Sequence, residues 1–456
     1  MDITPNTLYP IFRRHPVICT DTRQITPGCL FFALKGERFD ANDFAADALA
    51  KGAACAVVDN PAWKDSPHPQ LLWVPDVLDT LQQLAALHRR SLSIPVIALT
   101  GTNGKTTTKE LIYAVLSTTY RVTATQGNLN NHIGVPLSLL HLDDQTQIGL
   151  IEMGASHPEE IAQLVDLVQP TLGLITNVGK AHLEGFGSIE GVMACKGALY
   201  QHLVTHGGHI FYNTEEPLLY KMLQDAGVTP EDSNYPLTPY GISCQSVNCT
   251  RDRSQGALQV QIAGYPPIQT HLIGQYNLHN ILAALAVGRH FGVDPARAAA
   301  AIAAYQPTNN RSQWIQTDRN TLVVDAYNAN PTSMAASLDS FEQLPADNPK
   351  CFILGDMREL GTTSESEHAR VVERVNSFVQ QHPNSQVFWV GENFTRAAQE
   401  AGGRQQACTP QHTLPAHCFP NVDSLMEHLK QTPLSGYTLL IKGSNSLHLT
   451  RLKEIL

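Results

Sequence analysis

Short apolar runs alternate with helical patterns through the middle of the chain. The apolar runs cover residues 94–99, 148–153, 172–176 and 209–212. Between them, apolar side chains recur at helical spacing over residues 105–116, 158–168 and 189–202. Strands that alternate with helices predict a parallel sheet with helices on its faces.

The pattern loosens over residues 229–272, which are rich in Pro, Ser and Gln. One clean alternation remains there, at Leu258, Val260 and Ile262, and it predicts a β elaboration of the preceding unit. A helix is predicted over 277–291, and a Pro-containing link follows at 305–310.

A second α/β series begins after this link. Its predicted strands cover residues 321–325, 351–354, 386–390 and 438–441, and a helix with one apolar stripe is predicted over 365–381. We therefore expect three domains, with boundaries at 1–90, 91–306 and 307–456.

Composition narrows the class of protein. The 456 residues are 43% hydrophobic and 16% charged, which is enough apolar material for two or three globular cores. The formal net charge of −10 comes without a basic block, so we expect no binding to nucleic acid or to an anionic membrane surface. Nine scattered cysteines, no basic-then-apolar leader and no long apolar run lead us to expect a cytoplasmic protein without membrane insertion.

A Gly-bounded polar turn lies between the strand at 94–99 and the helix at 105–116. It consists of Gly101, Thr102, Asn103, Gly104, Lys105, Thr106 and Thr107. Backbone N–H groups at such a turn can hold phosphate, Lys105 would supply a point charge, and the Thr106 hydroxyl would bind Mg²⁺. Leu99 stands where a full Walker motif has Gly, which favours a narrower group than the general ATPases; the alternative is an ordinary Gly-rich turn.

Three further residues are candidates for the same centre. Glu152 ends the next predicted strand, where a magnesium ligand is expected, although a surface Glu is the alternative. His182 follows the third strand and would more often be a structural histidine. Lys196 cannot bind a cation while protonated, but a neutral amine can add carbon dioxide and become a carbamate ligand.

Several segments together resemble one family. Gly101 to Thr106, Glu152, His182 and Lys196 resemble the ATP-dependent Mur ligases, which lengthen the peptide of the bacterial cell-wall precursor. The branch that adds a D-alanyl-D-alanine dipeptide is the most similar, and the segments that indicate it lie at 21–23, 31–36, 128–131, 325–331, 354–361 and 442–444. The resemblance extends along the whole chain.

The resemblance implies a fold and a set of contacts. The fold is a small α/β N-terminal domain, a central parallel sheet of P-loop type with flanking helices, and a Rossmann-like α/β C-terminal domain. The N-terminal contacts to the UDP end would come from Asp21, Thr22, Arg23 and Phe31, with Asn128, Asn130 and Asn131 near the pyrophosphate and sugar. From the residues alone, Asp21 could equally be the cap of a turn.

The remaining implied contacts concern ATP and the dipeptide. Asn277 and Asn280 would contact adenine, Arg311 the phosphates, Asp325 the ribose, and Asn328 and Asn330 a phosphate or substrate. Asp356, Lys442 and Ser444 would shape the D-alanyl-D-alanine site. From the residues alone, Asn277 and Asn280 could be capping or surface amides, Arg311 a solvated side chain, and Asp356 a strand-end turn residue.

The resemblance also implies the reaction. ATP would activate the tripeptide carboxylate of a UDP-N-acetylmuramoyl precursor as an acyl phosphate, and the amine of D-alanyl-D-alanine would displace phosphate. One Mg²⁺ would lie on Thr106 and Glu152, and a second on His182 and carbamylated Lys196. We expect a monomer whose third domain closes onto the second, with small-molecule substrates as its only partners.

Some positions depart from the family pattern, and rival functions are open. Asp40 to Asp43 reads Asp-Ala-Asn-Asp instead of Asp-Gly-His-Asp, Ala198 replaces a common Glu, and Asn445 replaces a common Arg. The ligase that adds the third amino acid carries an Asp-Asn-Pro-Arg motif, whereas residues 347–350 end in Lys. Folylpolyglutamate synthetase is a second rival, and a silent nucleotide-binding module is a third; retention of all four candidate residues disfavours the silent module.

Overall fold

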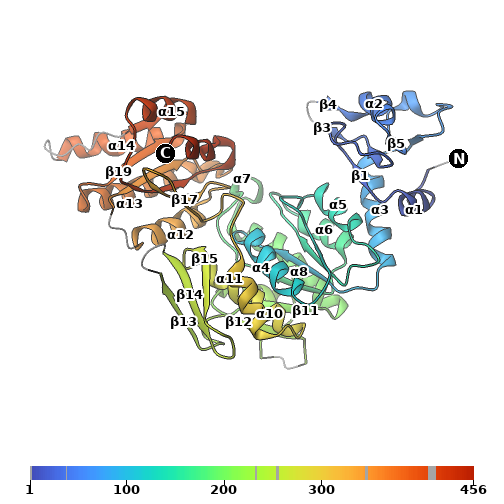
Figure 1. The fold of residues 1–456 in the computed structure, drawn as a ribbon, viewed down its shortest axis with the longest axis horizontal. Coiled ribbons are helices and arrows are strands. Elements are labelled where there is room, and N and C mark those ends of the chain that lie inside the picture. The colour runs from blue at the N-terminus through green and yellow to red at the C-terminus, as the bar shows by residue number, and fades with distance from the viewer. Residues whose placement is uncertain (1–2, 37–38, 232–233, 253–255, 345–347, 409–416) are drawn as a thin grey trace.

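The structure is a computed structural model that describes residues 3–36, 39–231, 234–252, 256–344, 348–408 and 417–456. Three α/β units follow one another along the chain, and the first and last units stand at opposite ends of the central one (Figure 1). In the described ranges, we find no helix with the length and apolar character needed to cross a membrane.

The N-terminal unit is built on a four-stranded parallel sheet of order β1-β2-β5-β6. Its strands are β1 (Ile18–Cys19), β2 (Leu30–Phe32), β5 (Cys55–Val58) and β6 (Leu71–Trp73). A separate antiparallel pair consists of β3 (Lys35–Gly36) and β4 (Phe39–Asp40). The helices are α1 (Pro5–Arg14), α2 (Ala45–Ala50) and α3 (Val77–Ser91), with 3-10 turns η1 (Ala41–Phe44) and η2 (Pro61–Trp63).

The central unit contains a six-stranded parallel sheet of order β12-β11-β10-β7-β9-β8. The strands are β7 (Val96–Thr100), β8 (Val122–Ala124), β9 (Ile148–Glu152), β10 (Leu172–Ile175), β11 (His209–Asn213) and β12 (Leu237–Tyr240). The helices are α4 (Lys105–Ser117), α5 (Gly134–Leu140), α6 (Glu160–Val168), α7 (Leu183–Phe186), α8 (Ile189–His206), α9 (Pro217–Asp225), α10 (Asn277–His290) and α11 (Pro295–Ala304).

Alternate residues of the central strands pack into two separate cores. Ile97 and Leu99 of β7 face the core made with α4, α10 and α11, whereas Val96 and Ala98 face the core made with α5, α6 and α8. Helix α3 packs against α5 and α6, and so joins the N-terminal unit to the central one. The predicted β elaboration is confirmed as an antiparallel sheet of β13 (Val247–Arg251), β14 (Ala257–Ile262) and β15 (Ile268–Ile273).

The C-terminal unit has a six-stranded sheet of order β16-β17-β21-β18-β19-β20, in which only β16 runs antiparallel. Its strands are β16 (Gln313–Gln316), β17 (Thr321–Asp325), β18 (Lys350–Gly355), β19 (Gln386–Val390), β20 (His417–Phe419) and β21 (Thr438–Lys442). The helices are α12 (Pro331–Glu342), α13 (Ser364–Gln381), α14 (Glu392–Cys408) and α15 (Val422–Gln431), with η3 (Gly361–Thr363), η4 (Asn445–Leu447) and η5 (Leu449–Glu454). Asp347, the first residue of the segment similar to the rival motif, lies outside the described residues, and β18 begins at Lys350.

The link between the last two units is fastened to the helix that follows the phosphate loop. The Tyr305 hydroxyl donates to one carboxylate oxygen of Glu110, and the Asn309 amide donates to the other at 2.7 Å. Glu110 lies on α4. The link to the C-terminal unit is therefore attached to α4, the helix that directly follows the phosphate loop.

Candidate active site

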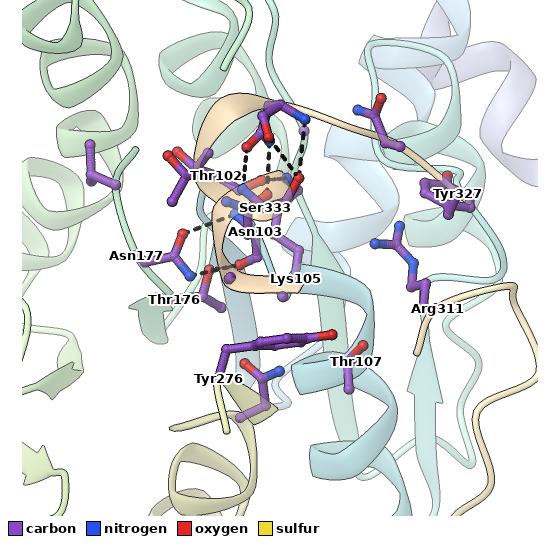
Figure 2. A pocket seen from close by; sticks show the side chains of 18 of the residues that line it. Thr102, Asn103, Lys105, Thr107, Thr176, Asn177, Tyr276, Arg311, Tyr327 and Ser333 are labelled. Carbon is purple, nitrogen blue, oxygen red and sulfur yellow. Dashed lines mark hydrogen bonds between the residues drawn. The ribbon is translucent and has the colours of Figure 1, made fainter. Parts of the chain in front are cut away.

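A cavity of about 560 Å³ lies between the central and C-terminal units. Its walls come from the turn after β7, the ends of β9 and β10, the start of α10 and the segment from Arg311 to Ser337. Side chains from both units point into this space (Figure 2). Ligands bind at the carboxyl ends of strands in open parallel sheets, and this cavity occupies that position.

The turn between β7 and α4 has the geometry of a phosphate loop. Gly101 and Gly104 adopt φ of 148° and 79°, and a Cβ on Gly101 would lie 1.9 Å from the Thr176 hydroxyl oxygen. The N–H of Asn103 donates to Asn177 Oδ1 at 2.9 Å, and the Thr176 hydroxyl donates to the Asn103 carbonyl at 2.7 Å. The end of β10 thus holds the loop open toward the cavity (Figure 2).

Lys105 begins α4 and points back into the loop. Its amine donates to the carbonyls of Gly101 at 2.7 Å and Thr102 at 3.3 Å. Burial lowers the pKa of Lys105 to about 8, Arg311 acts in the same direction, and Glu152 opposes them. A lysine at a helix N-terminus, surrounded by backbone N–H groups, is suited to phosphate oxygens.

Glu152 ends β9 in a buried polar cluster. Its Oε1 accepts from the Thr106 hydroxyl at 3.2 Å and from the Asn130 amide at 2.8 Å. Its Oε2 is buried without a hydrogen-bond partner, and the amine of Lys109 lies 3.8 Å away. A buried carboxylate oxygen without a donor costs free energy unless a cation meets it. The pair of Thr106 and Glu152 therefore fits an Mg²⁺ ion, which prefers oxygen ligands.

His182 lies just before α7 and lines the cavity. Its Nδ1 contacts the carboxylate of Glu359, which belongs to the C-terminal unit. Burial lowers the pKa of His182, although Glu359 opposes this shift. The neutral imidazole that results has one nitrogen available as a metal ligand.

Lys196 lies on α8 with only 2% of its surface exposed. Burial, followed by the charge of Lys105, lowers its pKa to about 7. Much of the amine is therefore neutral near pH 7. In the described parts of the chain, no group of three or more His, Cys, Asp and Glu side chains could hold a metal ion, so a cation here would need ligands such as Thr106 or a modified lysine.

Asn277 and Asn280 occupy the first turn of α10 and line the cavity. The amide of Asn280 donates to Asn277 Oδ1 at 2.8 Å, and the amide of Asn277 donates to the Ile273 carbonyl at 2.7 Å. Asn280 Oδ1 also accepts from the Thr108 hydroxyl at 3.0 Å. These bonds join α10 to α4, so both residues have a structural role in addition to the predicted one at adenine.

The C-terminal unit contributes a cation and a buried ion pair. The guanidinium of Arg311 stacks 3.7 Å from the centroid of the Tyr327 ring, and its Nε is buried without a partner. The amine of Lys442 donates to Asp325 Oδ2 at 2.7 Å. Burial is the largest single influence and opposes ionisation of Asp325, but Lys442, Ser337 and Arg311 together lower the pKa of this carboxyl. Arg311, Asp325 and Lys442 all line the cavity.

Asn330 of the C-terminal unit contacts the phosphate loop directly. Its amide donates to Asn103 Oδ1 in the phosphate loop at 2.9 Å, while its own Oδ1 caps α12 by accepting from the Ser333 N–H. Asn328 lines the cavity close by, and its Oδ1 accepts from the Ala329 N–H. The predicted residues of the last unit are thus brought to the loop itself.

Other predicted residues do not reach this cavity. Asp21 pairs with Arg23 at 2.7 Å on the surface of the N-terminal unit, and Thr22 lies between them. Phe31 is fully buried in the core of the N-terminal sheet, which leaves no exposed aromatic surface for a ligand. Any role of these residues at a UDP group involves a site separate from the cavity.

Only some of the predicted residues in the loop between β8 and α5 line the cavity. Asn130 and Asn131 line the cavity, but Asn128 does not. Asn131 Oδ1 also accepts from the Gly134 N–H at 2.9 Å, which fixes the start of α5.

Asp356 and Ser444 are used inside the C-terminal unit. Asp356 accepts from the N–H groups of Asn393 and Phe394 at the start of α14, and only 1% of it is exposed. The Ser444 hydroxyl accepts from the Arg358 N–H at 3.0 Å. Neither lines the cavity, so their predicted contact with the dipeptide stays a prediction.

Several residues that line the cavity are not among those predicted. They include Asn177, Asn213, Glu216, Tyr276, His279 and Tyr327. Asn177 and Asn213 stand at or just after the ends of parallel strands, and that position could have signalled them. Tyr276 has no such signal: its hydroxyl meets Ser312 at 2.5 Å across the two units, a contact that depends on the tertiary fold.

Comparison with known families covers most of the chain. The Mur ligase middle domain matches residues 99–288, the glutamate ligase domain of Mur ligases matches 310–445, and the catalytic domain of the Mur ligase family matches 16–89. These three matches follow the order of the three α/β units.

Individual proteins show the same likeness. The UDP-N-acetylmuramoyl-tripeptide–D-alanyl-D-alanine ligase of Bacillus subtilis is 33% identical over 95% of this chain and 91% of that protein. A crystal structure of MurF from Acinetobacter baumannii has a TM-score of 0.81 at 28% identity, covering 100% of this chain and 98% of that chain. MurF ligase from Thermotoga maritima, solved in complex with ADP, has a TM-score of 0.78 at 25% identity, covering 96% of each chain. Three family domains match in order along the chain, and the cavity has a phosphate loop with a carboxylate next to it. This chain therefore belongs to the Mur ligase family.

Proposed function

We propose that this protein is an ATP-dependent ligase that joins a UDP-N-acetylmuramoyl tripeptide to D-alanyl-D-alanine in peptidoglycan precursor synthesis. The observation that carries the proposal is the cavity, where Lys105 and Glu152 of the central unit face Arg311 of the C-terminal unit. The likeness to ligases of that name over almost the whole chain supports the choice of substrates.

The reaction must first activate a carboxylate, because oxide is no leaving group. The terminal carboxylate of the tripeptide attacks the γ-phosphorus of ATP, the bond to ADP breaks, and an acyl phosphate forms. The amine of the dipeptide then attacks the acyl carbon, and inorganic phosphate leaves with one oxygen from the original carboxylate. One amide bond is made for each ATP consumed.

Several anions must meet in this cavity. Two like charges about 4 Å apart repel by about 4 kcal/mol at an effective dielectric constant near 20. Lys105 lies within the phosphate loop, and Arg311 of the C-terminal unit lines the same cavity. Their charges offset that repulsion and stabilise the transferring phosphoryl group.

We further propose that two Mg²⁺ ions complete the site. Thr106 and Glu152 would hold one, and the Oε2 of Glu152, which is buried and accepts no hydrogen bond, supports this assignment. His182 and carbamylated Lys196 would hold the other. When bound, Mg²⁺ neutralises phosphate charge and orients the phosphates.

The carbamate at Lys196 would form by addition of carbon dioxide to the neutral amine, with loss of one proton. The buried position of Lys196 and its lowered pKa support a neutral amine. The product has charge −1 and offers the oxygen ligands that Mg²⁺ prefers.

The finer assignments belong to the same proposal. Residues 1–90, 91–306 and 307–456 would form the UDP-binding, ATP-binding and dipeptide-binding domains. Asp21, Thr22 and Arg23 would meet the UDP group, and Lys442 the dipeptide side of the cavity. The eight cysteines whose side chains the structure describes are free thiols, which supports a cytoplasmic location. A monomer is part of the same proposal.

The deciding experiment follows phosphate and oxygen together. Phosphate release should require both the muramyl tripeptide and the dipeptide. With ¹⁸O in the tripeptide carboxylate, one labelled oxygen should appear in each phosphate released. Release without the dipeptide at the full rate, or unlabelled phosphate, would contradict the proposed route.

A further inference from the structure

The C-terminal unit reaches His182 through one carboxylate. The Nδ1 of His182 and the Oε2 of Glu359 are in hydrogen-bond contact, and their side chains are 29% and 55% exposed. The N–H of Glu184 donates to the main-chain carbonyl of Glu359 at 3.2 Å. A side-chain bond and a nearby main-chain bond therefore both join Glu359 to the segment around His182.

The backbone on both sides of this contact is unusual. His182 adopts φ of 51° and Glu359 adopts φ of 60°, in the left-handed region that non-Gly residues rarely occupy. Strained residues of this kind persist where the surrounding structure fixes them, and they cluster at functional sites. The two facing loops are thus built to bring this imidazole and this carboxylate together.

The chemistry of the contact assigns the ring nitrogens. An ionised carboxylate can only accept hydrogen bonds, so Nδ1 of His182 must donate to Glu359. In a neutral imidazole, Nε2 then keeps its lone pair and is the nitrogen that can bind a metal ion. Metal-binding histidines are commonly fixed in this way by a carboxylate on the other nitrogen.

We propose that Glu359 is a positioning residue that fixes the ring and tautomer of His182 for metal binding, and that it does so only when the C-terminal unit is docked. The inference rests on the proposed function, because it takes His182 as a metal ligand. Glu359 follows β18 of the last unit, whereas His182 belongs to the central one. Docking of the C-terminal unit and completion of the metal site are then one event.

A neighbouring ion pair provides the matched control. The amine of Lys180 meets Glu367 Oε1 at 2.8 Å across the same interface. This pair joins the units without touching His182. Loss of Glu367 therefore tests docking alone, whereas loss of Glu359 tests docking together with histidine positioning.

The test measures metal binding without turnover. Mn²⁺ is titrated into the full-length protein saturated with ADP, and free Mn²⁺ is followed by electron paramagnetic resonance. Glu359→Ala should weaken Mn²⁺ binding about tenfold or more, the range found when such supporting carboxylates are removed. Glu367→Ala should change it by less than about twofold, because this ion pair does not contact His182 and its Lys180 side chain is 47% exposed.

His182→Asn separates the two ways of failing. If His182→Asn leaves Mn²⁺ affinity unchanged, the proposed metal role of His182 is wrong, and this inference falls with it. If His182→Asn weakens binding but Glu359→Ala does not, or if Glu367→Ala weakens it equally, only the positioning role of Glu359 is overturned.

A spectroscopic readout addresses the tautomer directly. In protein labelled with ¹⁵N-histidine, the His182 signal is found by its loss in His182→Asn, among 19 histidines. The wild-type signal should show the proton on Nδ1, and Glu359→Ala should move it toward Nε2. An unchanged spectrum in Glu359→Ala would overturn the proposal.

Discussion

Lys105 donates its hydrogen bonds to its own loop, with the carbonyls of Gly101 and Thr102 as acceptors. Phosphate oxygens would compete for the same amine as stronger, charged acceptors. Lys105→Ala should therefore reduce the rate of phosphate release by a factor of at least about 10³, because a transition-state charge loses its partner. Lys430→Ala, at an exposed lysine on α15, should leave the rate unchanged. Near-normal turnover in Lys105→Ala would remove the phosphate loop from the mechanism.

Replacement of Lys196 tests the proposed carbamate. Lys196→Ala should inactivate the enzyme, and added short carboxylic acids such as acetate should restore part of the activity by replacing the carbamate oxygens. The same acids should not rescue Lys105→Ala, which lacks a cation and not a carboxylate. Full activity of Lys196→Ala without any acid would refute the carbamate.

The pH dependence follows from the same amine. Only neutral Lys196 adds carbon dioxide, and its pKa lies at about 7. Turnover should therefore decline as the pH falls through this value in buffers depleted of carbon dioxide. Added bicarbonate should move the decline to lower pH, since it favours the carbamate. A profile that ignores bicarbonate would contradict this chemistry.

Local sequence signals are sufficient for some site residues and not for others. Lys105 can be predicted because a strand, a Gly-bounded turn and a helix lie next to each other in the chain, and Glu152 because it ends the next predicted strand. The contacts of Glu359 with His182 and of Asn330 with Asn103 join residues 177 and 227 positions apart. No periodicity reports such a pairing, because it depends on how two complete units meet.

Among the elements, the buried strands of the central and C-terminal sheets are the most predictable. The strands predicted from apolar runs are all present, with ends displaced by no more than two residues. The short edge strands β8 and β20 escape prediction, because they are only partly buried and lack a continuous apolar run. Helix α8 extends to His206, beyond the prediction, and ends where Gly207 adopts φ of 66°.

Helix α11 offers a test of capping at this scale. The carboxylate of Asp294 accepts from the N–H groups of Ala296 and Arg297 at the start of the helix. Asp294→Ala should cost about 1 kcal/mol of local stability, the usual value of such a cap. Amide hydrogen exchange in the first turn of α11 should then become about fivefold faster, whereas exchange in α15 should not change. Equal exchange in both proteins would show that the cap contributes little.

For the whole molecule, the chief expectation is movement of the C-terminal unit. Asn330 and Glu367 contact the central unit, and the cavity is complete only with residues from both. We expect the unit to swing away to admit ATP and to return for catalysis. Small-angle scattering should show a smaller radius of gyration with Mg²⁺ and a non-hydrolysable ATP analogue than without them. One rigid shape under both conditions would count against this closure.

The three-part plan can be read from the two α/β series and the link between them. The relative placement of the parts cannot, because it depends on surfaces such as that of α3 against α5 and α6. Hydrophobic periodicity shows that a helix face is buried, but not which neighbour covers it. The docked position of the C-terminal unit is therefore known only from the structure and cannot be predicted from the sequence pattern.

The attachment of Tyr305 and Asn309 to Glu110 has a consequence for this movement. A unit tethered beside its partner can pivot but cannot diffuse away, so its effective concentration at the phosphate loop stays high. In each catalytic cycle, the C-terminal unit then needs only to rotate about the link in order to dock again. Product can leave while the two hydrogen bonds to Glu110 keep the link in the position from which the unit docks again.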